Sequence, residues 1–172
     1  MRAVDVRPDP VHAPPPVAPE PTILKRLVGS GDRILLVVLP VLAVGLALNI
    51  AFPQAFAVGG PPAALRVLSV VLLVPGVIVW AWSVALILVK VPRGELITTG
   101  PYAVVKHPIY IGVALLVVPW LGFLLDSWLG VVVGAALYLA SRRFAPREEA
   151  VLAKTFGKAW DDYAQNIRLP WL

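Results

Sequence analysis

The sequence contains no cysteine and only two histidines, His12 and His107. Without cysteine, this chain has no disulfides, no thiolate metal ligands, no cysteine nucleophile and no cysteine-linked lipid. With only two histidines, a histidine-based metal centre is not expected, and we predict no metal site. Any thiol in the chemistry of this protein would belong to its substrate.

Charge is also scarce, because charged residues make up 15% of the chain, hydrophobic residues 59%, and the mean hydropathy is +0.82. These values are far more apolar than those of a soluble domain. A hydrocarbon core about 30 Å thick needs about 20 helical residues to cross it. We therefore predict an all-α integral membrane protein with about four transmembrane helices, over residues 34–52, 67–89, 109–125 and 127–143. The last two should form a helical hairpin with its tip at Asp126 and Ser127.

The basic residues predict the orientation of these spans. Of the 15 lysines and arginines, only Arg66 lies in a connection on the far side of a four-span arrangement. Cytoplasmic segments carry an excess of basic residues, so both termini and the 90–106 connection should face the cytoplasm, most simply at the cell membrane. The net charge of +5 then reflects anchoring to a lipid bilayer, and no nucleic-acid partner is expected.

The two ends of the chain differ in character. Residues 1–22 hold seven of the 18 prolines and predict a disordered tail, which leaves one domain over residues 23–172. Residues 146–170 predict an amphipathic helix on the cytoplasmic membrane face, weakened or kinked at Gly157. Within the hairpin, Gly130 and Gly134 have the spacing of close helix contacts, and we expect packing within the chain rather than a dimer. The oligomeric state stays open.

The segment GELITTGPYAVVKHPIY, residues 94–110, places charged and turn-forming residues between two hydrophobic runs. Pro108 suits the first turn of a helix, which puts His107 at or beside the N-cap. Lys106 and His107 would add donors to the positive end of that helix, so the expected ligand group is an anion. The alternative is that Gly100 and Pro101 form only a turn and that Lys106 is only an interfacial anchor.

Taken with Glu148 and Glu149 one hairpin later, this segment resembles the superfamily of isoprenylcysteine carboxyl methyltransferases and phospholipid methyltransferases. The resemblance covers residues 94–170, with cofactor-site segments at 94–110 and 146–170. It implies a membrane enzyme that binds S-adenosylmethionine on the cytoplasmic side and methylates a lipophilic or lipidated acceptor. The cofactor-binding residues that it implies are Gly100, Pro101, Tyr102, His107, Pro108, Tyr110, Glu148 and Glu149. With His107, the residues nearer the acceptor would be Arg147 and Arg168.

One residue departs from the family pattern, because Lys106 stands where the family usually has arginine. Lysine keeps the charge but lacks the fork that binds a carboxylate through two hydrogen bonds. A carboxylate acceptor would need only a cationic steering group, whereas an amine or a thiol would also need a base, such as His107 or a glutamate. The sequence leaves the acceptor open, and the leading interpretation is a membrane-embedded S-adenosylmethionine-dependent methyltransferase that resembles isoprenylcysteine carboxyl O-methyltransferase. The alternatives are N-methylation of a phospholipid amine, and a non-catalytic four-span scaffold or accessory protein.

Overall fold

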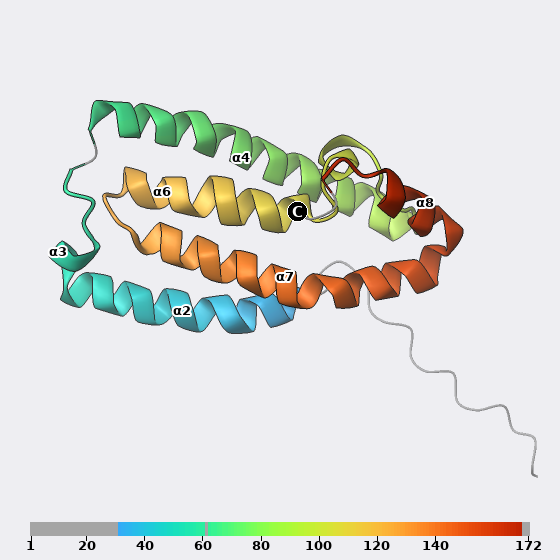
Figure 1. Ribbon diagram of the computed structural model, residues 1–172, viewed down its shortest axis with the longest axis horizontal. Coiled ribbons are helices and arrows are strands. Elements are labelled where there is room, and N and C mark those ends of the chain that lie inside the picture. Colours follow the sequence, from blue (N-terminus) through green and yellow to red (C-terminus); the bar gives the residue numbers. More distant parts are fainter. Residues whose placement is uncertain (1–30, 61, 170–172) are drawn as a thin grey trace, which may run out of the picture.

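The computed structural model describes residues 31–60 and 62–169, and the regular structure of this part is helical, with one isolated bridge between Ala57 and Ser127 (Figure 1). The predicted disordered tail and His12 lie outside the described residues. The main helices are α2 (Gly31–Ala51), α3 (Pro53–Phe56), α4 (Ala63–Lys90), α5 (Pro108–Ile111), α6 (Val118–Leu124), α7 (Leu129–Phe156) and α8 (Lys158–Asn166). A π-helical stretch, Gly112–Val117, joins α5 to α6, so that Pro108–Leu124 forms one apolar helix.

Four helices lie side by side, and their order in space differs from their order in the chain (Figure 1). Helix α2 packs on α7, α7 packs on Pro108–Leu124, and Pro108–Leu124 packs on α4. The last two long helices therefore lie between the first two. This arrangement brings the C-terminal part of α7 to the same end of the bundle as the connection that follows α4.

The helices Pro108–Leu124 and α7 approach each other through glycines. A Cβ atom on Gly130 would lie 2.5 Å from the carbonyl oxygen of Val118, and one on Gly134 would lie 2.5 Å from that of Ala114. Only glycine permits so close an approach of two helix backbones. The expectation that Gly130 and Gly134 serve packing within the chain is confirmed.

The tip of this hairpin is held by the connection between α2 and α4. The Asp126 carboxylate accepts a hydrogen bond from the Gly60 amide at 3.0 Å. The Ser127 hydroxyl donates to the side-chain oxygen of Asn49 on α2 at 2.8 Å. Asp126 also has a positive φ of 54°, which aspartate tolerates better than most residues. The predicted tip at Asp126 and Ser127 is therefore confirmed.

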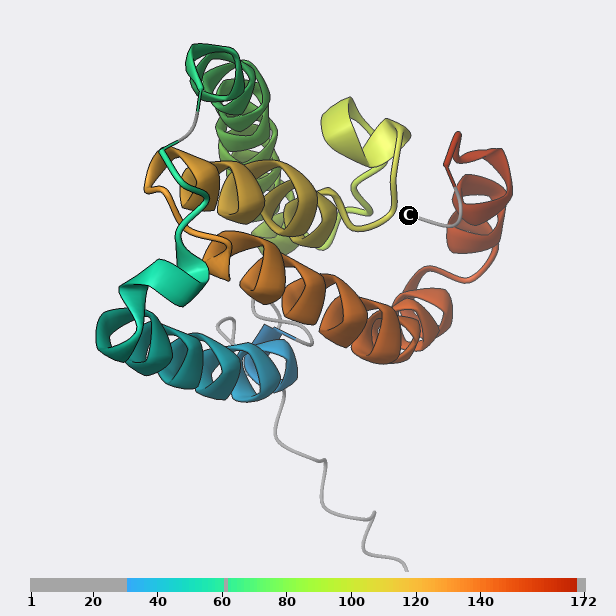
Figure 2. The ribbon, with the colours of Figure 1, turned by 60° about the vertical axis from the view of Figure 1, so that its left-hand side comes forward.

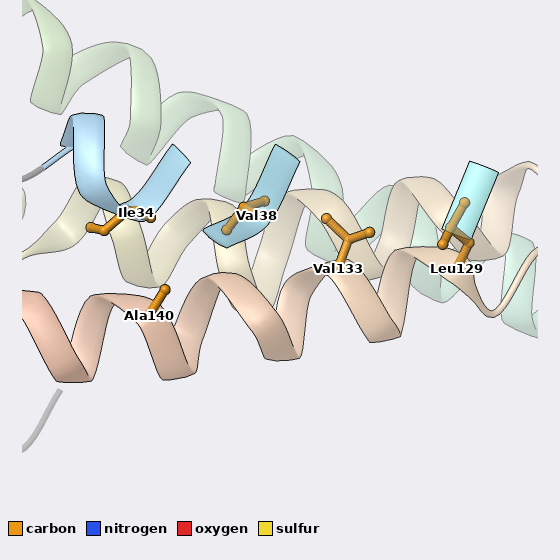
Figure 3. Packing of buried hydrophobic residues seen from close by; sticks show 5 residues of the cluster. All are labelled: Ile34, Val38, Leu129, Val133 and Ala140. Carbon is orange, nitrogen blue, oxygen red and sulfur yellow. The ribbon is translucent and has the colours of Figure 1, made fainter. Parts of the chain in front are cut away.

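The buried core joins α2 to α7, with Ile34 and Val38 packed against Leu129, Val133 and Ala140 (Figure 3). Outside it, α2 and the segment Ala63–Arg93 are long and apolar enough to cross a membrane, and only 11% of the most apolar stretch of each is buried. A core helix of a soluble protein would be mostly covered, so these exposed apolar surfaces suit a nonpolar solvent. Two of the four predicted spans thus meet the length requirement, whereas Pro108–Leu124 is shorter.

The C-terminal region differs from the prediction. A new amphipathic helix was expected after Pro146, but α7 continues through Pro146 to Phe156. Proline removes one helix hydrogen bond, and the rest of a long helix tolerates that loss. The predicted kink at Gly157 is confirmed, because this residue, with a φ of +52°, ends α7 and starts α8 in another direction. In α8, Trp160 is buried and the neighbouring Asp161 and Asp162 are exposed.

Candidate functional site

The connection after α4 and the C-terminal helix α8 meet at one end of the bundle. Figure 2 shows α8, in red, turned back toward this connection, in yellow. The Tyr163 hydroxyl of α8 donates a hydrogen bond to the Tyr102 carbonyl oxygen at 2.7 Å, and the Leu169 amide donates to the Val104 carbonyl oxygen at 3.0 Å. These two bonds join the two segments that the sequence marks as a site.

Pro108 and His107 occupy the expected places at the start of α5. Pro108 is buried in the first turn, and His107 is the N-cap residue, although its side chain makes no capping hydrogen bond. The imidazole instead faces α7, where its Nε2 lies 3.2 Å from Oε1 of Glu149. Its ring also stacks on the ring of Tyr110, with centroids 5.8 Å apart. The histidine is therefore held between two other site residues.

Glu149 is the residue on which both basic groups converge. Its Oε2 accepts a hydrogen bond from Lys106 Nζ at 3.0 Å, and its Oε1 pairs with His107. The hydrogen bond from His107 lowers the pKa of the Glu149 carboxyl, and the hydrogen bond and charge of Lys106 lower it further, against the opposing effect of burial. Glu149 is accordingly an anion at neutral pH.

Three tyrosines surround the glutamate pair. The Tyr110 hydroxyl donates to Oε2 of Glu148 at 3.4 Å. Burial raises the pKa of Tyr102, and the negative charge of Glu148 raises it further. Burial, followed by the charge of Glu149, raises the pKa of Tyr163 to about 12. The hydroxyls of Tyr102 and Tyr163 therefore stay neutral donors at physiological pH.

A cavity of about 270 Å³ opens where the start of α5 faces α7. Its charged groups are those of Lys106, Arg142 and Glu149, with His107 beside them. The full lining is Lys106, His107, Ile111, Ser141, Arg142, Ala145, Pro146 and Glu149. We call this the α7 cavity. Its formal charges sum to a positive value, so it suits a ligand that carries an anionic group.

The sequence did not point to Ser141 and Arg142 as members of this site. Ser141 and Arg142 are spaced from Ala145 and Glu149 so that all four lie on one face of a helix. A predicted helix that ran through Pro146 would therefore have indicated Ser141 and Arg142 as site residues. Proline made a helix boundary the simpler interpretation. The sequence signal was present, but the helix boundary predicted at Pro146 hid it.

A second cavity, of about 310 Å³, lies between residues 98–103 and α8. Its lining is Thr98, Ala103, Asp162, Tyr163, Asn166 and Ile167. We call this the α8 cavity. Thr98 and Ala103 line it, and Lys106 and His107 of the same connection line the α7 cavity. The two cavities are therefore neighbours.

The remaining predicted residues do not line either cavity. Gly100 packs closely against the Trp82 ring of α4, and Pro101 is half-buried beside it. Arg147 is exposed, with its guanidinium 5.8 Å from the centre of the Phe144 ring. Arg168 is exposed as well. The roles expected for Arg147 and Arg168 stay predictions.

Within residues 31–60 and 62–169, no group of three or more histidine and acidic side chains could hold a metal ion. The polar groups that converge here are two carboxylates, basic side chains and phenols. Such a set suits a polar organic ligand with both positive and negative groups.

A model of the phospholipid methyltransferase family matches residues 65–159. The chain belongs to this family. No curated protein and no solved structure matches it significantly. The matched region contains Lys106, His107, Glu148 and Glu149, the residues whose contacts are described above.

Membership of this family implies a membrane methyltransferase. Methyltransferases of the phospholipid methyltransferase family generally use S-adenosylmethionine. The exposed apolar surfaces of α2 and α4 agree with a membrane location. The predicted resemblance to the integral membrane methyltransferases is confirmed.

Proposed function

We propose that this phospholipid methyltransferase family member transfers a methyl group from S-adenosylmethionine to a lipophilic, membrane-borne acceptor. The observation that carries the proposal is the convergence of Lys106 and His107 on Glu149. That contact joins the two halves of the family signature at the edge of the α7 cavity. A purely structural ion pair would not need a neighbouring cavity of about 270 Å³.

The proposed membrane arrangement has four spans with both termini and the site on the cytoplasmic side. In Figure 1 the start of α2, the end of α4 and α8 lie at one end of the bundle, and the hairpin tip lies at the other. The predicted partition of basic residues agrees with this arrangement, since Arg66 belongs to the tip end. The hairpin would complete the crossing with a thinner bilayer or with interfacial residues at its ends.

The residues present fit the cofactor. S-adenosylmethionine would supply an electrophilic methyl group on a positively charged sulfur, together with an α-amino and an α-carboxylate group. Glu148 and Glu149 offer carboxylates for positive groups, and Lys106 offers an ammonium for a negative one. The lowered pKa of Glu149 keeps its carboxylate charged at neutral pH.

Methyl transfer of this kind is an in-line displacement, so the protein has to align the two reactants and exclude water. No protein nucleophile is needed. Tyr110 donates to Glu148, and the largely buried Tyr102 and Tyr163 would form part of the wall that keeps water from the reactants. His107 lies at the cavity edge, where it can orient an acceptor or take a proton from one.

For the acceptor, we favour a lipophilic molecule with a carboxylate, as in isoprenylcysteine carboxyl O-methylation. Lys106 and Arg142 line the same cavity, so Arg142 offers the guanidinium fork that Lys106 lacks. Ile111 and Ala145 line it too, next to the apolar helices along which a lipid tail would lie. The family description favours a second candidate, the amine of a phospholipid. That reaction would place the lipid phosphate near the basic groups and would use His107 or Glu149 as the base.

Isothermal titration of the full chain in detergent with S-adenosylmethionine and S-adenosylhomocysteine tests the proposal. Saturable binding of both, lost in Glu149→Gln, supports an enzyme. Absence of binding would overturn it in favour of a scaffold or accessory protein. Labelled S-adenosylmethionine, offered with a farnesylated cysteine analogue or with phosphatidylethanolamine vesicles, then separates the two acceptors.

A further inference from the structure

The α8 cavity has no role in the function proposed so far. It lies outside the apolar helices, between residues 98–103 and α8, and its lining mixes polar and apolar groups. Thr98, Asp162 and Asn166 provide the polar part, and Ala103 and Ile167 provide the apolar part. At about 310 Å³ it falls within the range of small-molecule sites.

Asp162 carries the one formal charge in this lining. Its side chain is exposed, and no basic side chain among the described residues forms an ion pair with it. A carboxylate accepts hydrogen bonds and donates none at neutral pH. The cavity therefore favours a ligand that presents donors, and adjacent hydroxyl groups on a sugar are the class that a single carboxylate binds most simply.

The apolar side of the cavity favours a flat ring. Ile167 is 7% exposed, and Ala103 and the body of the Tyr163 side chain lie in the same lining. Tyr163 is held in place by its hydrogen bond to the Tyr102 carbonyl oxygen at 2.7 Å. A rigid aromatic wall beside aliphatic groups accommodates the face of a heterocyclic base.

The position of the cavity indicates which reactant enters it. A water-soluble ligand reaches a site formed by α8 and an interhelical connection, whereas a lipid-borne acceptor reaches the α7 cavity beside Ile111 and Ser141. Because Thr98 and Ala103 line this cavity, and Lys106 and His107 of the same connection contact Glu149, one extended ligand can occupy the α8 cavity and reach the carboxylates.

We infer that the α8 cavity holds the nucleoside half of the cofactor, with the Asp162 carboxylate accepting hydrogen bonds from the ribose hydroxyls. This inference rests on the proposed function, and it assigns a binding role to α8 and to Asp162. The amino-acid half of the cofactor then extends past Tyr163 toward Glu148 and Glu149. The α7 cavity is left for the acceptor.

Titration with S-adenosylhomocysteine and with its 2′,3′-dideoxy analogue, which lacks both ribose hydroxyls, tests the inference. Hydrogen bonds to a charged group are worth enough that the wild-type chain should bind the dideoxy analogue at least about tenfold more weakly. Asp162→Asn should bind S-adenosylhomocysteine with a similar loss. Because Asp162→Asn removes the charge that strengthens these hydrogen bonds, its affinity for the dideoxy analogue should fall less than the affinity of the wild type does.

The matched control is Asp161→Asn, which removes a carboxylate from the adjacent exposed position outside the cavity lining. Its affinity for S-adenosylhomocysteine should equal that of the wild type. The inference is overturned if the wild type binds both ligands equally, or if the losses from Asp162→Asn and from the missing hydroxyls add. If the wild type binds neither ligand, the proposed function itself fails, and the inference fails with it. The wild-type comparison of the two ligands needs no variant, so a folding defect in Asp162→Asn would not prevent a decision.

Discussion

The carboxylate of Glu149 lies 3.0 Å from the ammonium of Lys106, across 43 residues of sequence. The hairpin formed by Pro108–Leu124 and α7 separates them in the chain and returns the second to the first. Their side chains are 15% and 29% exposed, so water screens the pair only in part. The ion pair thus connects the start of one helix to a late turn of the next at the proposed site.

Replacing both glutamates should weaken cofactor binding. Glu148→Gln combined with Glu149→Gln removes two charges from proposed hydrogen bonds to the cofactor, each worth on the order of 1.5 to 3 kcal/mol. Affinity for S-adenosylhomocysteine, measured by titration, should fall by at least about tenfold. If the glutamates only stabilise the fold, the melting temperature would drop while the affinity stayed at the wild-type value.

His107→Ala should abolish methyl transfer in a membrane assay with labelled S-adenosylmethionine, because the imidazole lies at the edge of the α7 cavity. The matched control is His12→Ala, which changes the other histidine of the chain and should leave turnover unchanged. If His107→Ala kept wild-type turnover, His107 would be only a structural partner of Glu149.

The pH profile of the wild type should identify the acceptor class. A carboxylate needs no base, so the rate should be flat with pH above the titration of that carboxylate. An amine acceptor must lose a proton first, and its rate should rise with pH. A rising profile with a carboxylate substrate would contradict the carboxyl assignment.

Acid should destabilise the fold partly through Glu149. Its pKa in the folded protein lies below the ordinary value of 4.5, so the unfolded chain binds the proton more readily. The stabilisation is present above pH 4.5 and is lost as the pH falls through the folded-state pKa. Thermal unfolding in detergent should therefore show that Glu149→Gln lowers the stability of the fold more at pH 7 than in acid.

The control for this measurement is Glu95→Gln, which removes a carboxylate from the more exposed pair with Lys90. It reports the effect of losing one exposed carboxylate that pairs with neither Lys106 nor His107. If Glu149→Gln lowered the stability equally at every pH, the lowered pKa of the Glu149 carboxyl would be contradicted.

Alkaline pH should destabilise the contact between α8 and the 91–107 connection. The pKa of Tyr163 is raised from 10.0 to about 12, so the unfolded chain ionises first, and stability is lost as the pH rises from 10 toward 12. The Tyr163→Phe variant should lose less stability than the wild type over this pH range. At neutral pH it should cost about 0.5–1.5 kcal/mol, because it removes the hydrogen bond to Tyr102. Tyr138→Phe, which removes a hydroxyl from α7, is the matched control; equal effects of the two variants would contradict the role of Tyr163.

Reporter fusions should place both ends of the domain in the cytoplasm. A fusion after Leu172 should be active only with a cytoplasmic reporter, and one inserted at Gly59–Gly60, near the hairpin tip, only with an extracytoplasmic reporter. The opposite pattern would invert the orientation and move the proposed site to the other side of the membrane.

The sequence alone determined the class of protein and the location of its unusual chemistry. Apolar runs with few charges predicted the helices, because a chain that crosses lipid must satisfy its backbone hydrogen bonds locally. Pro108 predicted the start of a helix and His107 its N-cap, because these positions depend on the backbone geometry of neighbouring residues. The order of turn, histidine and glutamate pair was enough to indicate the family.

Tertiary structure alone decided how these parts meet. Helix α7 runs through Pro146, because its packing on α2 and on the preceding helix outweighs the hydrogen bond that proline removes. That continuity places Ser141 and Arg142 on the same cavity as Glu149, and their helical spacing in the sequence indicates this only once the helix is known to run through Pro146. The order of the helices in space and the contact of Lys106 with Glu149 likewise arise from packing between distant segments. Such contacts depend on the shapes of whole helix surfaces, which no local pattern of residues encodes.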